Sequence, residues 1–205
     1  SAFSVLVVSG EPGTGELGVI VPITAPALGT GLLDASQLAT LTASGGALRA
    51  RLDAVTGTSA ILAVDPAIVA AIRVLGSSAP ATAVRWLDDL MTLPNSRFAL
   101  QFGDADLATQ IGAGLSDPLT VATLDPYLSS SESTATPTPA PTATDAATEQ
   151  TTLERMTDVR AAPGSVFWPA TGTAGGEVVA ALGSLTTDDV PSITLLDSSA
   201  VASDA

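Results

Sequence analysis

The clearest pattern in the chain is a short apolar run that changes into a helical stripe at an acidic residue. Residues 60–64 are apolar and partly β-branched, which is typical of a strand buried on both faces. Asp65 and Pro66 follow, an N-cap residue type and the residue type suited to the first helical turn. Apolar side chains then recur at helical spacing until Gly76, which can end a helix. The pattern predicts one complete strand-to-helix unit.

Several other stretches repeat this strand-then-helix pattern less perfectly. The hydrophobic periodicity predicts further strands over residues 4–8, 19–24, 97–103, 119–124, 165–169 and 192–196. It predicts further helices over residues 34–41, 48–55, 81–91, 107–115, 150–161 and 176–183. Parallel strands need helical crossovers of this length, so the alternation indicates an α/β fold with a mostly parallel sheet. An eight-unit barrel normally needs about 250 residues, so this chain of 205 residues predicts a partial or irregular (β/α) barrel.

Composition divides the chain into four segments. Residues 1–17 hold the first strand and a glycine-rich connector, and residues 18–128 form the first part of the α/β domain. Residues 129–148 are rich in Ser, Thr and Pro and have no apolar stripe, which predicts a disordered loop. Thr/Pro tracts of this kind are found in glycosylated stalks, and a plain flexible linker is the alternative. Residues 149–205 form the second part of the domain.

Charge and composition exclude several function classes. The net charge is −14, which disfavours nucleic acid and anionic lipid as partners. There is no His, Cys or Lys, which removes Ser-His-Asp chemistry, His-ligated zinc, thiolate chemistry and Schiff bases. Gly13–Gly18 matches the dinucleotide-binding glycine pattern, but a strand containing Pro22 follows it instead of the helix that such a site needs. We therefore expect no cofactor and no metal.

No apolar run approaches the roughly 20 residues that span a bilayer, so we expect no direct membrane segment. The first residues also lack the basic and apolar regions of a secretion signal, which indicates that any such signal has been removed or never existed.

Acidic residues stand at or just after the ends of the predicted strands. In barrels and open α/β sheets, the carboxyl ends of the strands form the site face. Two carboxylates on that face could act as acid and as base or nucleophile in glycoside hydrolysis, and aromatic rings there could stack on a sugar. The candidate catalytic residues are Asp65, Asp104, Asp106, Asp125 and Asp197, and the candidate ligand-binding rings are Trp168 and Tyr127.

Each of these residues also has a structural interpretation. Asp65 and Asp125 precede a proline, and Asp104 and Asp106 precede a predicted helix, so all four suit N-capping or a helix start. Trp168 can equally be a packing ring, because large aromatic side chains dominate burial where they occur.

Four motifs together resemble a known protein family. Val21–Thr24, Ile61–Pro66, Trp86-Leu87 and Phe98–Asp106 are similar to motifs of an uncharacterised actinobacterial cell-envelope family, rich in Ala, Val and Gly. The resemblance spans roughly residues 18 to 197. It implies a secreted or membrane-anchored protein whose central domain is similar to the glycoside hydrolase/deacetylase barrels, with an anchor in the full-length protein. It implies no catalytic residues, and the usual metal-dependent deacetylase chemistry is excluded because its two His ligands are missing.

These observations support two hypotheses. The first is an extracytoplasmic module, derived from a glycan-processing barrel, that binds or scaffolds without catalysis, with a cell-wall glycan or another envelope protein as partner. The second is an Asp-dependent glycoside hydrolase acting on cell-wall polysaccharide. Carboxylates committed to helix N-termini would favour the first, and two carboxyl groups within about 10 Å across an open cleft would favour the second.

Overall fold

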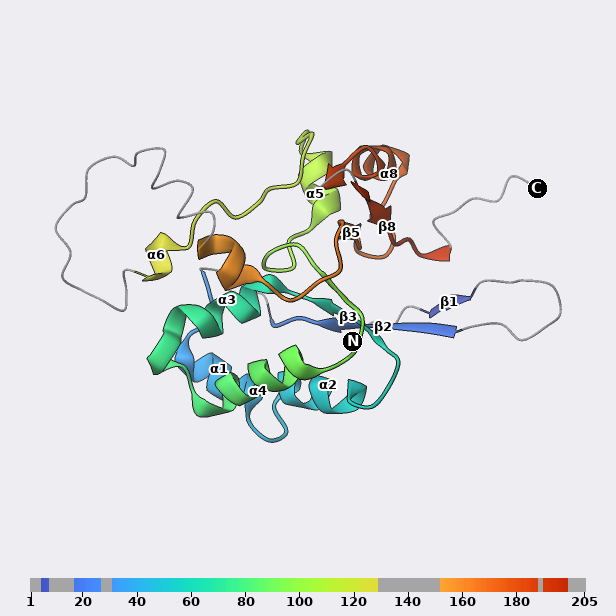
Figure 1. Cartoon of the computed structure of the whole chain (residues 1–205). Helices are drawn as coiled ribbons and strands as arrows, with labels where there is room; N and C mark the ends of the chain where they lie inside the picture. The colour runs from blue at the N-terminus through green and yellow to red at the C-terminus, as the bar shows by residue number, and fades with distance from the viewer. Residues whose placement is uncertain (1–4, 8–16, 27–30, 129–151, 188–189, 199–205) are drawn as a thin grey trace, which may run out of the picture.

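The centre of the molecule is a four-stranded, mostly parallel sheet. A computed structural model describes residues 5–7, 17–26, 31–128, 152–187 and 190–198. The strands lie in the order β1-β2-β3-β4, with β1 antiparallel to β2 and with β2, β3 and β4 parallel (Figure 1). Their bounds are β1 (Val5–Val7), β2 (Leu17–Ile23), β3 (Ile61–Val64) and β4 (Arg97–Ala99). The prediction of an α/β fold with a mostly parallel sheet is confirmed.

Helices connect the parallel strands. They are α1 (Ala35–Thr42) and α2 (Ala47–Val55) between β2 and β3, then α3 (Pro66–Leu75), the 3-10 turn η1 (Gly76–Ser78) and α4 (Ala81–Thr92) between β3 and β4. The unit predicted over residues 60–76 is confirmed, because β3 runs directly into α3 through the N-cap Asp65. The predictions of the other three helices are confirmed to within a residue or two at each end.

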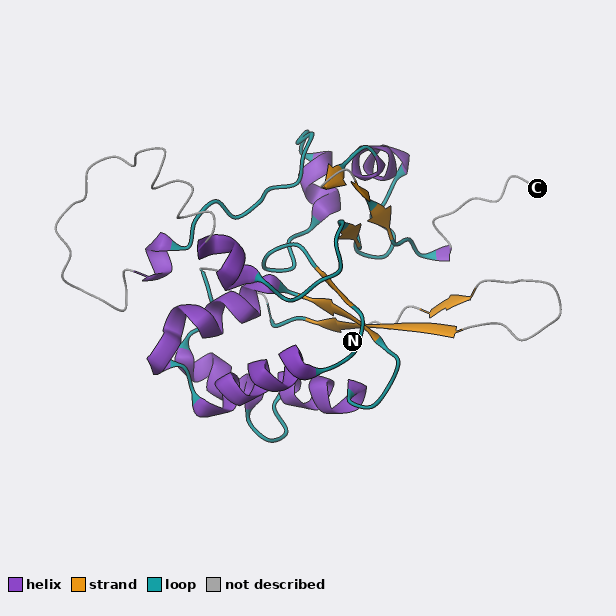
Figure 2. Ribbon diagram, in the orientation of Figure 1, coloured by secondary structure: helices purple, strands orange, loops and turns teal. Residues whose placement is uncertain are grey.

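The larger hydrophobic core lies between these helices and one face of the sheet (Figure 2). Side chains of a strand alternate between its two faces. Leu62 and Val64 of β3 are fully buried against helix residues, and Ala63 between them belongs to a separate cluster on the other face. Trp86 of α4 is the largest fully buried side chain in this core.

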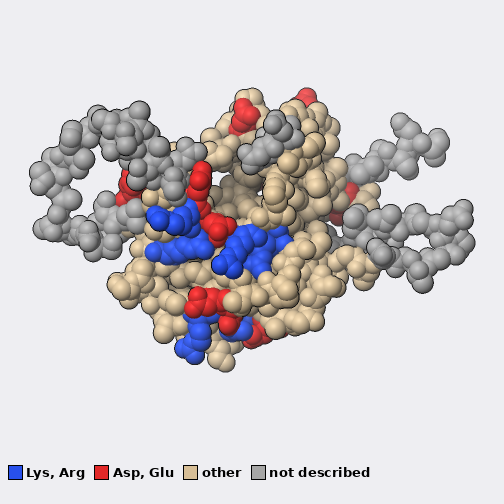
Figure 3. All heavy atoms as spheres, viewed as in Figure 1, with Lys and Arg blue, Asp and Glu red and all other residues tan. Residues whose placement is uncertain are grey.

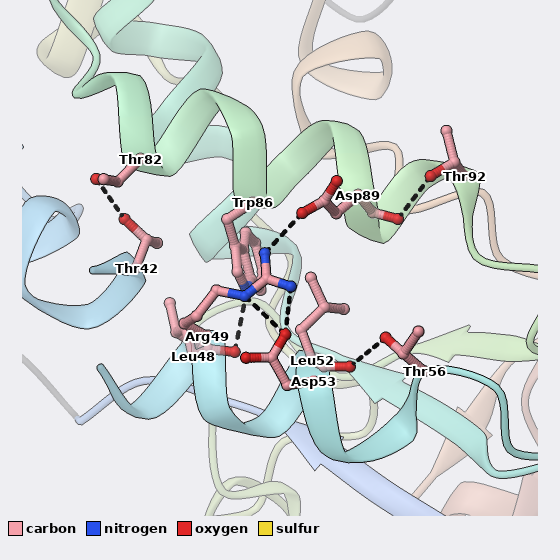
Figure 4. A network of polar contacts seen from close by, with 10 residues as sticks. All are labelled: Thr42, Leu48, Arg49, Leu52, Asp53, Thr56, Thr82, Trp86, Asp89 and Thr92. Atoms are coloured by element: carbon pink, nitrogen blue, oxygen red, sulfur yellow. Dashed lines mark hydrogen bonds and ion pairs between the residues drawn. The ribbon is translucent and has the colours of Figure 1, made fainter. Parts of the chain in front are cut away.

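Polar contacts join the helices of this layer to one another (Figure 4). The Trp86 indole N–H donates to the Leu48 carbonyl at 3.0 Å, which satisfies a donor that burial would otherwise leave without a partner. Arg49 of α2 forms ion pairs with Asp53 on its own helix and with Asp89 on α4, the latter at 2.6 Å. The indole contact and the Arg49–Asp89 ion pair hold α2 against α4.

The elements α5, α8, β5 and β8 lie over the opposite face of the sheet (Figure 1), whereas Val159 belongs to the larger core. Val166, Trp168 and Leu195 pack against the cluster that includes Ala63 and Phe98. This part contains a parallel pair of strands, β5 with β8, and an antiparallel pair, β6 with β7. The elements after β4 are α5 (Leu107–Gly112), α6 (Asp125–Leu128), a helical segment over residues 152–157, β5 (Val166–Phe167), α8 (Gly176–Gly183), β6 (Thr186–Thr187), β7 (Val190–Pro191) and β8 (Ile193–Thr194).

Arg73 and Arg160 join these two parts of the chain, and we call them, together with the neighbouring Arg97, the arginine clasp. One Arg73 nitrogen, Nη1, donates to the carbonyls of residues 155, 156 and 158 at 2.8, 3.1 and 2.8 Å. The Arg97 guanidinium binds the Leu90 and Leu93 carbonyls at the end of α4, and Arg160 binds the Met91 carbonyl at 3.1 Å. Guanidinium groups are suited to helix C-termini because the last carbonyls there lack helical partners. Figure 3 shows basic side chains gathered in the middle of this face.

One expectation about the fold is corrected. Residues 119–124 form no strand, and Leu119 is 65% exposed, with its backbone N–H donating to the Gln110 side chain at 2.6 Å instead of to a ladder. The strands of the described residues form one four-stranded sheet and two pairs, without closing a barrel. The glycine-rich connector and the Ser/Thr/Pro-rich loop lie outside the described residues.

Candidate functional site

The carboxyl ends of β2, β3 and β4 meet at one edge of the sheet, as the sequence predicts. The Asp65 backbone N–H donates to the Ile23 carbonyl at 3.1 Å, and the Leu100 N–H donates to the Val64 carbonyl at 2.9 Å. Thr24, Asp65 and the loop of residues 101–106 therefore follow three adjacent strands. The prediction that polar residues gather at this edge is confirmed for these three, because the carboxyl ends of parallel strands lie on the same side of a sheet.

A groove runs beside β2 toward this edge. Its volume is about 1130 Å³, and it is bounded by β2, α2, residues 100–107 and residues 168–171. Its walls are largely apolar, with a few polar side chains, which is typical of small-molecule sites. The lining residues that matter for its chemistry are Thr24, Arg51, Leu100, Asp104, Asp106 and Trp168.

Asp65 is buried behind the groove and holds two chain segments together. Its side chain is the N-cap of α3, with Oδ1 accepting from the Ala67 N–H at 2.9 Å. The same oxygen accepts from the Gly103 N–H at 2.9 Å. Burial raises the pKa of Asp65 to about 6, against the effect of these two hydrogen bonds, and the nearby charge of Asp104 raises it further. Asp65 therefore positions the loop that carries Asp104.

Asp104 lines the groove, and its carboxylate has no partner among the described residues. It adopts a left-handed backbone conformation, with φ of 52° directly after Gly103 at 71°, and its N–H donates to the Gln101 carbonyl at 2.9 Å. Asp is among the few residue types that tolerate this conformation. Its side chain accepts no hydrogen bond and forms no ion pair within the described residues, and desolvation raises its pKa. Its carboxylate is therefore available to a ligand.

Asp106 lines the same groove, but both of its carboxylate oxygens are occupied. Oδ1 accepts from the Ala108 and Thr109 N–H groups at 2.9 and 3.2 Å, and Oδ2 accepts from the Thr109 hydroxyl at 2.6 Å. The side chain is thus the N-cap of α5, and its hydrogen bonds, first that from the Thr109 hydroxyl, lower its pKa. The N-capping interpretation is confirmed for Asp65 and Asp106, whereas Asp104 caps no helix.

The other sequence candidates lie away from the groove. Asp125 is exposed and begins α6 after an irregular segment, because the strand expected before it does not form. Tyr127 lies against Gly31, where an added Cβ atom would approach the tyrosine ring to 2.9 Å. Asp197 follows β8, which belongs to the separate β5–β8 pair. None of the three lines the groove, so a common rim for all five acidic candidates was a wrong expectation.

Trp168 is a packing ring that also reaches the groove wall. It packs against the cluster of Phe98 and Ala63, and it also lines the groove while half-buried. Sequence reasoning missed Arg51, whose guanidinium donates to the Thr24 carbonyl and lies in the groove wall. Its position on α2 next to the apolar stripe gave no signal, because a charged residue there is normally solvent-facing.

Among the described residues, no group of three or more acidic side chains is placed to hold a metal ion. None of the described helices combines the length and the apolar character that crossing a bilayer requires.

Comparison with known proteins adds no relative, since no family model, no curated protein and no solved structure matches the chain. The described residues form an α/β fold with a small, mostly parallel sheet and a groove beside β2 whose lining includes Asp104, Asp106 and Trp168.

Proposed function

We propose that the protein is a non-catalytic, extracytoplasmic module of the cell envelope that binds a cell-wall glycan in the groove beside β2. The observation that carries the proposal is the pairing of a half-buried ring, Trp168, with a carboxylate that has no partner in the described residues, Asp104, in the walls of one groove. A largely apolar groove with a few placed polar groups suits a ligand that has both hydrophobic faces and hydroxyl groups.

Binding is favoured over hydrolysis because the acidic residues have structural duties. Hydrolysis needs two carboxyl groups free to flank the glycosidic bond. Asp65 is committed through Oδ1 to α3 and Gly103, and Asp106 is committed through both oxygens to α5. Asp104 is the one carboxylate of this cluster without such a duty among the described residues.

We further propose that the sheet derives from a glycan-processing (β/α) barrel, as the resemblance to the actinobacterial envelope family implies. The sequential order of β2, β3 and β4, with the crossover helices packed on one face, supports this origin because successive barrel units have the same arrangement.

The binding proposal is tested by intrinsic fluorescence and calorimetry with soluble cell-wall polysaccharide fragments. Trp168→Ala is expected to weaken binding at least tenfold, and Asp104→Asn to weaken it by a smaller factor. Asp88→Asn is the matched control, because Asp88 is exposed on α4 and lies outside the groove. Unchanged binding by folded Trp168→Ala would contradict the proposal.

A hydrolase is the second candidate, and one observation favours it. The pKa of Asp104 is raised by desolvation, while hydrogen bonds lower that of Asp106 in the same groove. Carboxyl groups with pKa values moved in opposite directions are a pattern of acid and base pairs. Release of reducing ends from the polysaccharide, abolished by Asp104→Asn and retained by Asp88→Asn, would identify a hydrolase; absence of release together with binding would identify the module.

A further inference from the structure

The described lining of the groove beside β2 carries two carboxylates and one guanidinium, so negative charge is in excess. The ionisable residues among its described lining are Arg51, Asp104 and Asp106. The Arg51 guanidinium donates to the Thr24 carbonyl at the same sheet edge, but within the described residues it forms no ion pair with Asp65 or Asp104. Asp65 adds a third carboxylate directly behind the groove wall, joined to it by the hydrogen bond from Gly103.

Asp65 and Asp104 repel each other in a partly desolvated place. The charge of Asp104 raises the pKa of Asp65, and among the described residues no basic side chain forms an ion pair with either carboxylate. Partly buried charges are costly when they lack a partner of opposite sign. A positively charged ligand group at Asp104 would remove this cost, whereas a phosphate or carboxylate on the ligand would increase it.

We propose that the groove selects glycans that carry free amines, with the ammonium group of an amino sugar against the Asp104 carboxylate and the sugar ring against Trp168. This selection rests on the glycan-binding function proposed above. The aromatic ring adds to the preference, because a cation held over a tryptophan face is attracted by the ring electrons. A single ammonium fits the site better than a divalent metal ion, because both Asp106 oxygens are occupied by α5 and the Asp65 Oδ1 is occupied by two backbone N–H groups.

The test compares short glucosamine oligomers with their fully N-acetylated counterparts, using the full chain in calorimetry at neutral pH. The amine form is expected to bind at least tenfold more tightly, with the advantage shrinking as salt is added, because salt screens charge interactions. Asp104→Asn is expected to remove the advantage, because it weakens the binding of the amine oligomer at least tenfold and that of the acetylated oligomer by a much smaller factor. Asp88→Asn removes the same charge outside the groove and is expected to keep the advantage, which separates local recognition from attraction by the net charge of −14.

Several outcomes separate this inference from the proposed function. Equal binding of both oligomers, with Trp168→Ala weakening both, would overturn the amine preference and leave glycan binding in place. Failure of the wild type to bind either oligomer or any cell-wall fragment would overturn both. Displacement of the amine oligomer by calcium, together with calcium binding that Asp104→Asn removes, would assign the carboxylates to a metal ion and overturn the inference.

Discussion

The two halves of the described chain are stabilised in different ways. The sheet region (residues 17–100) has long crossover helices and a core of fully buried side chains such as Leu62 and Trp86. The C-terminal region (residues 152–198) has strands of two residues and a smaller core around Phe167 and Leu182. Its main helix, α8, has no side-chain N-cap, whereas α1 begins with a reciprocal capping box between Asp34 and Gln37.

This difference indicates that the C-terminal region depends on the sheet region for its stability more than the sheet region depends on it. The C-terminal region relies on the sheet region, because Val166 and Trp168 pack on Phe98 and the arginine clasp holds residues 155–160. The sheet region has a core of its own. The groove lies where the two meet, with Asp104 and Trp168 contributed from outside the sheet. Binding segments commonly come from the less stable part of a protein, supported by a rigid one.

The strongest test of this dependence removes one buried side chain from each region. Trp86→Ala is expected to cost about 3–5 kcal/mol and to unfold both regions, because the cavity lies in the core on which everything else packs. Leu182→Ala is expected to cost about 2–5 kcal/mol within the C-terminal region alone. Hydrogen exchange measures amide protection in each region separately. Equal loss of protection in the sheet region for Leu182→Ala would contradict the unequal dependence.

Substitution of Asp65 is expected to have the next largest effect on stability. It bears on the comparison of the two regions because Asp65 holds the loop of residues 101–106, which lies where they meet. Its folded-state pKa is raised from 3.8 to about 6, so the folded protein holds the proton more tightly than the unfolded chain. The contribution of this group to stability is therefore highest below pH 3.8, declines as the pH rises to about 6, and above that is a cost of about 3 kcal/mol.

Asp65→Asn keeps the Oδ1 acceptor without the charge. We expect the variant to be about 1–3 kcal/mol more stable than the wild type above pH 6 and about equal to it below pH 3.8. Urea unfolding followed across this pH range measures the difference. A constant difference at every pH would show that the charge of Asp65 costs nothing in the folded state.

The sequence predicts the sheet region better than the residues that follow β4. The unit around Asp65 was predictable because strand pattern, N-cap, proline and helical stripe all agree over one stretch of chain. The helices α1, α2 and α4 carry similarly complete signals. The stretch 119–124 has a strand-like composition, but its six residues have no neighbouring strand to pair with. A strand depends on its partner, and composition alone cannot supply one.

The candidate site was predictable in part, for a related reason. Asp65 and Asp104 come together because parallel neighbours end at one edge, which the strand order implies. Asp125 and Asp197 were assigned to the same edge on the assumption that all strands join one sheet, and β8 belongs to another pair. The left-handed turn at Gly103 and Asp104, which frees Asp104 from capping, has no sequence signal beyond the glycine.

The arginine clasp gives a smaller effect and tests how the regions are joined. Arg73→Ala removes the donor to three carbonyls of residues 155–158, and we expect a cost of about 1–3 kcal/mol that falls on the C-terminal region. Trp168 reports on that region in a Trp86→Phe background, so its fluorescence follows the loss in urea. Arg85→Ala is the matched control, because Arg85 is exposed on α4, and it is expected to change stability by less than about 0.5 kcal/mol. Equal stability of Arg73→Ala and Arg85→Ala would show that the arginine clasp does not stabilise the C-terminal region.

The smallest effect comes from the N-cap glycines, where one substitution should have opposite signs in the two regions. Gly175 caps α8 without a side-chain hydrogen bond, and an added Cβ there meets nothing within 4 Å. Gly175→Ser is therefore expected to stabilise the C-terminal region by about 0.5–1 kcal/mol, since serine adds an N-cap acceptor and restricts the unfolded chain. Gly46 caps α2 in the same extended conformation, but a Cβ there would collide with the Thr40 and Leu41 carbonyls. Gly46→Ser is expected to destabilise the sheet region. If urea unfolding gives the same sign for both substitutions, local packing does not explain why α2 begins with glycine.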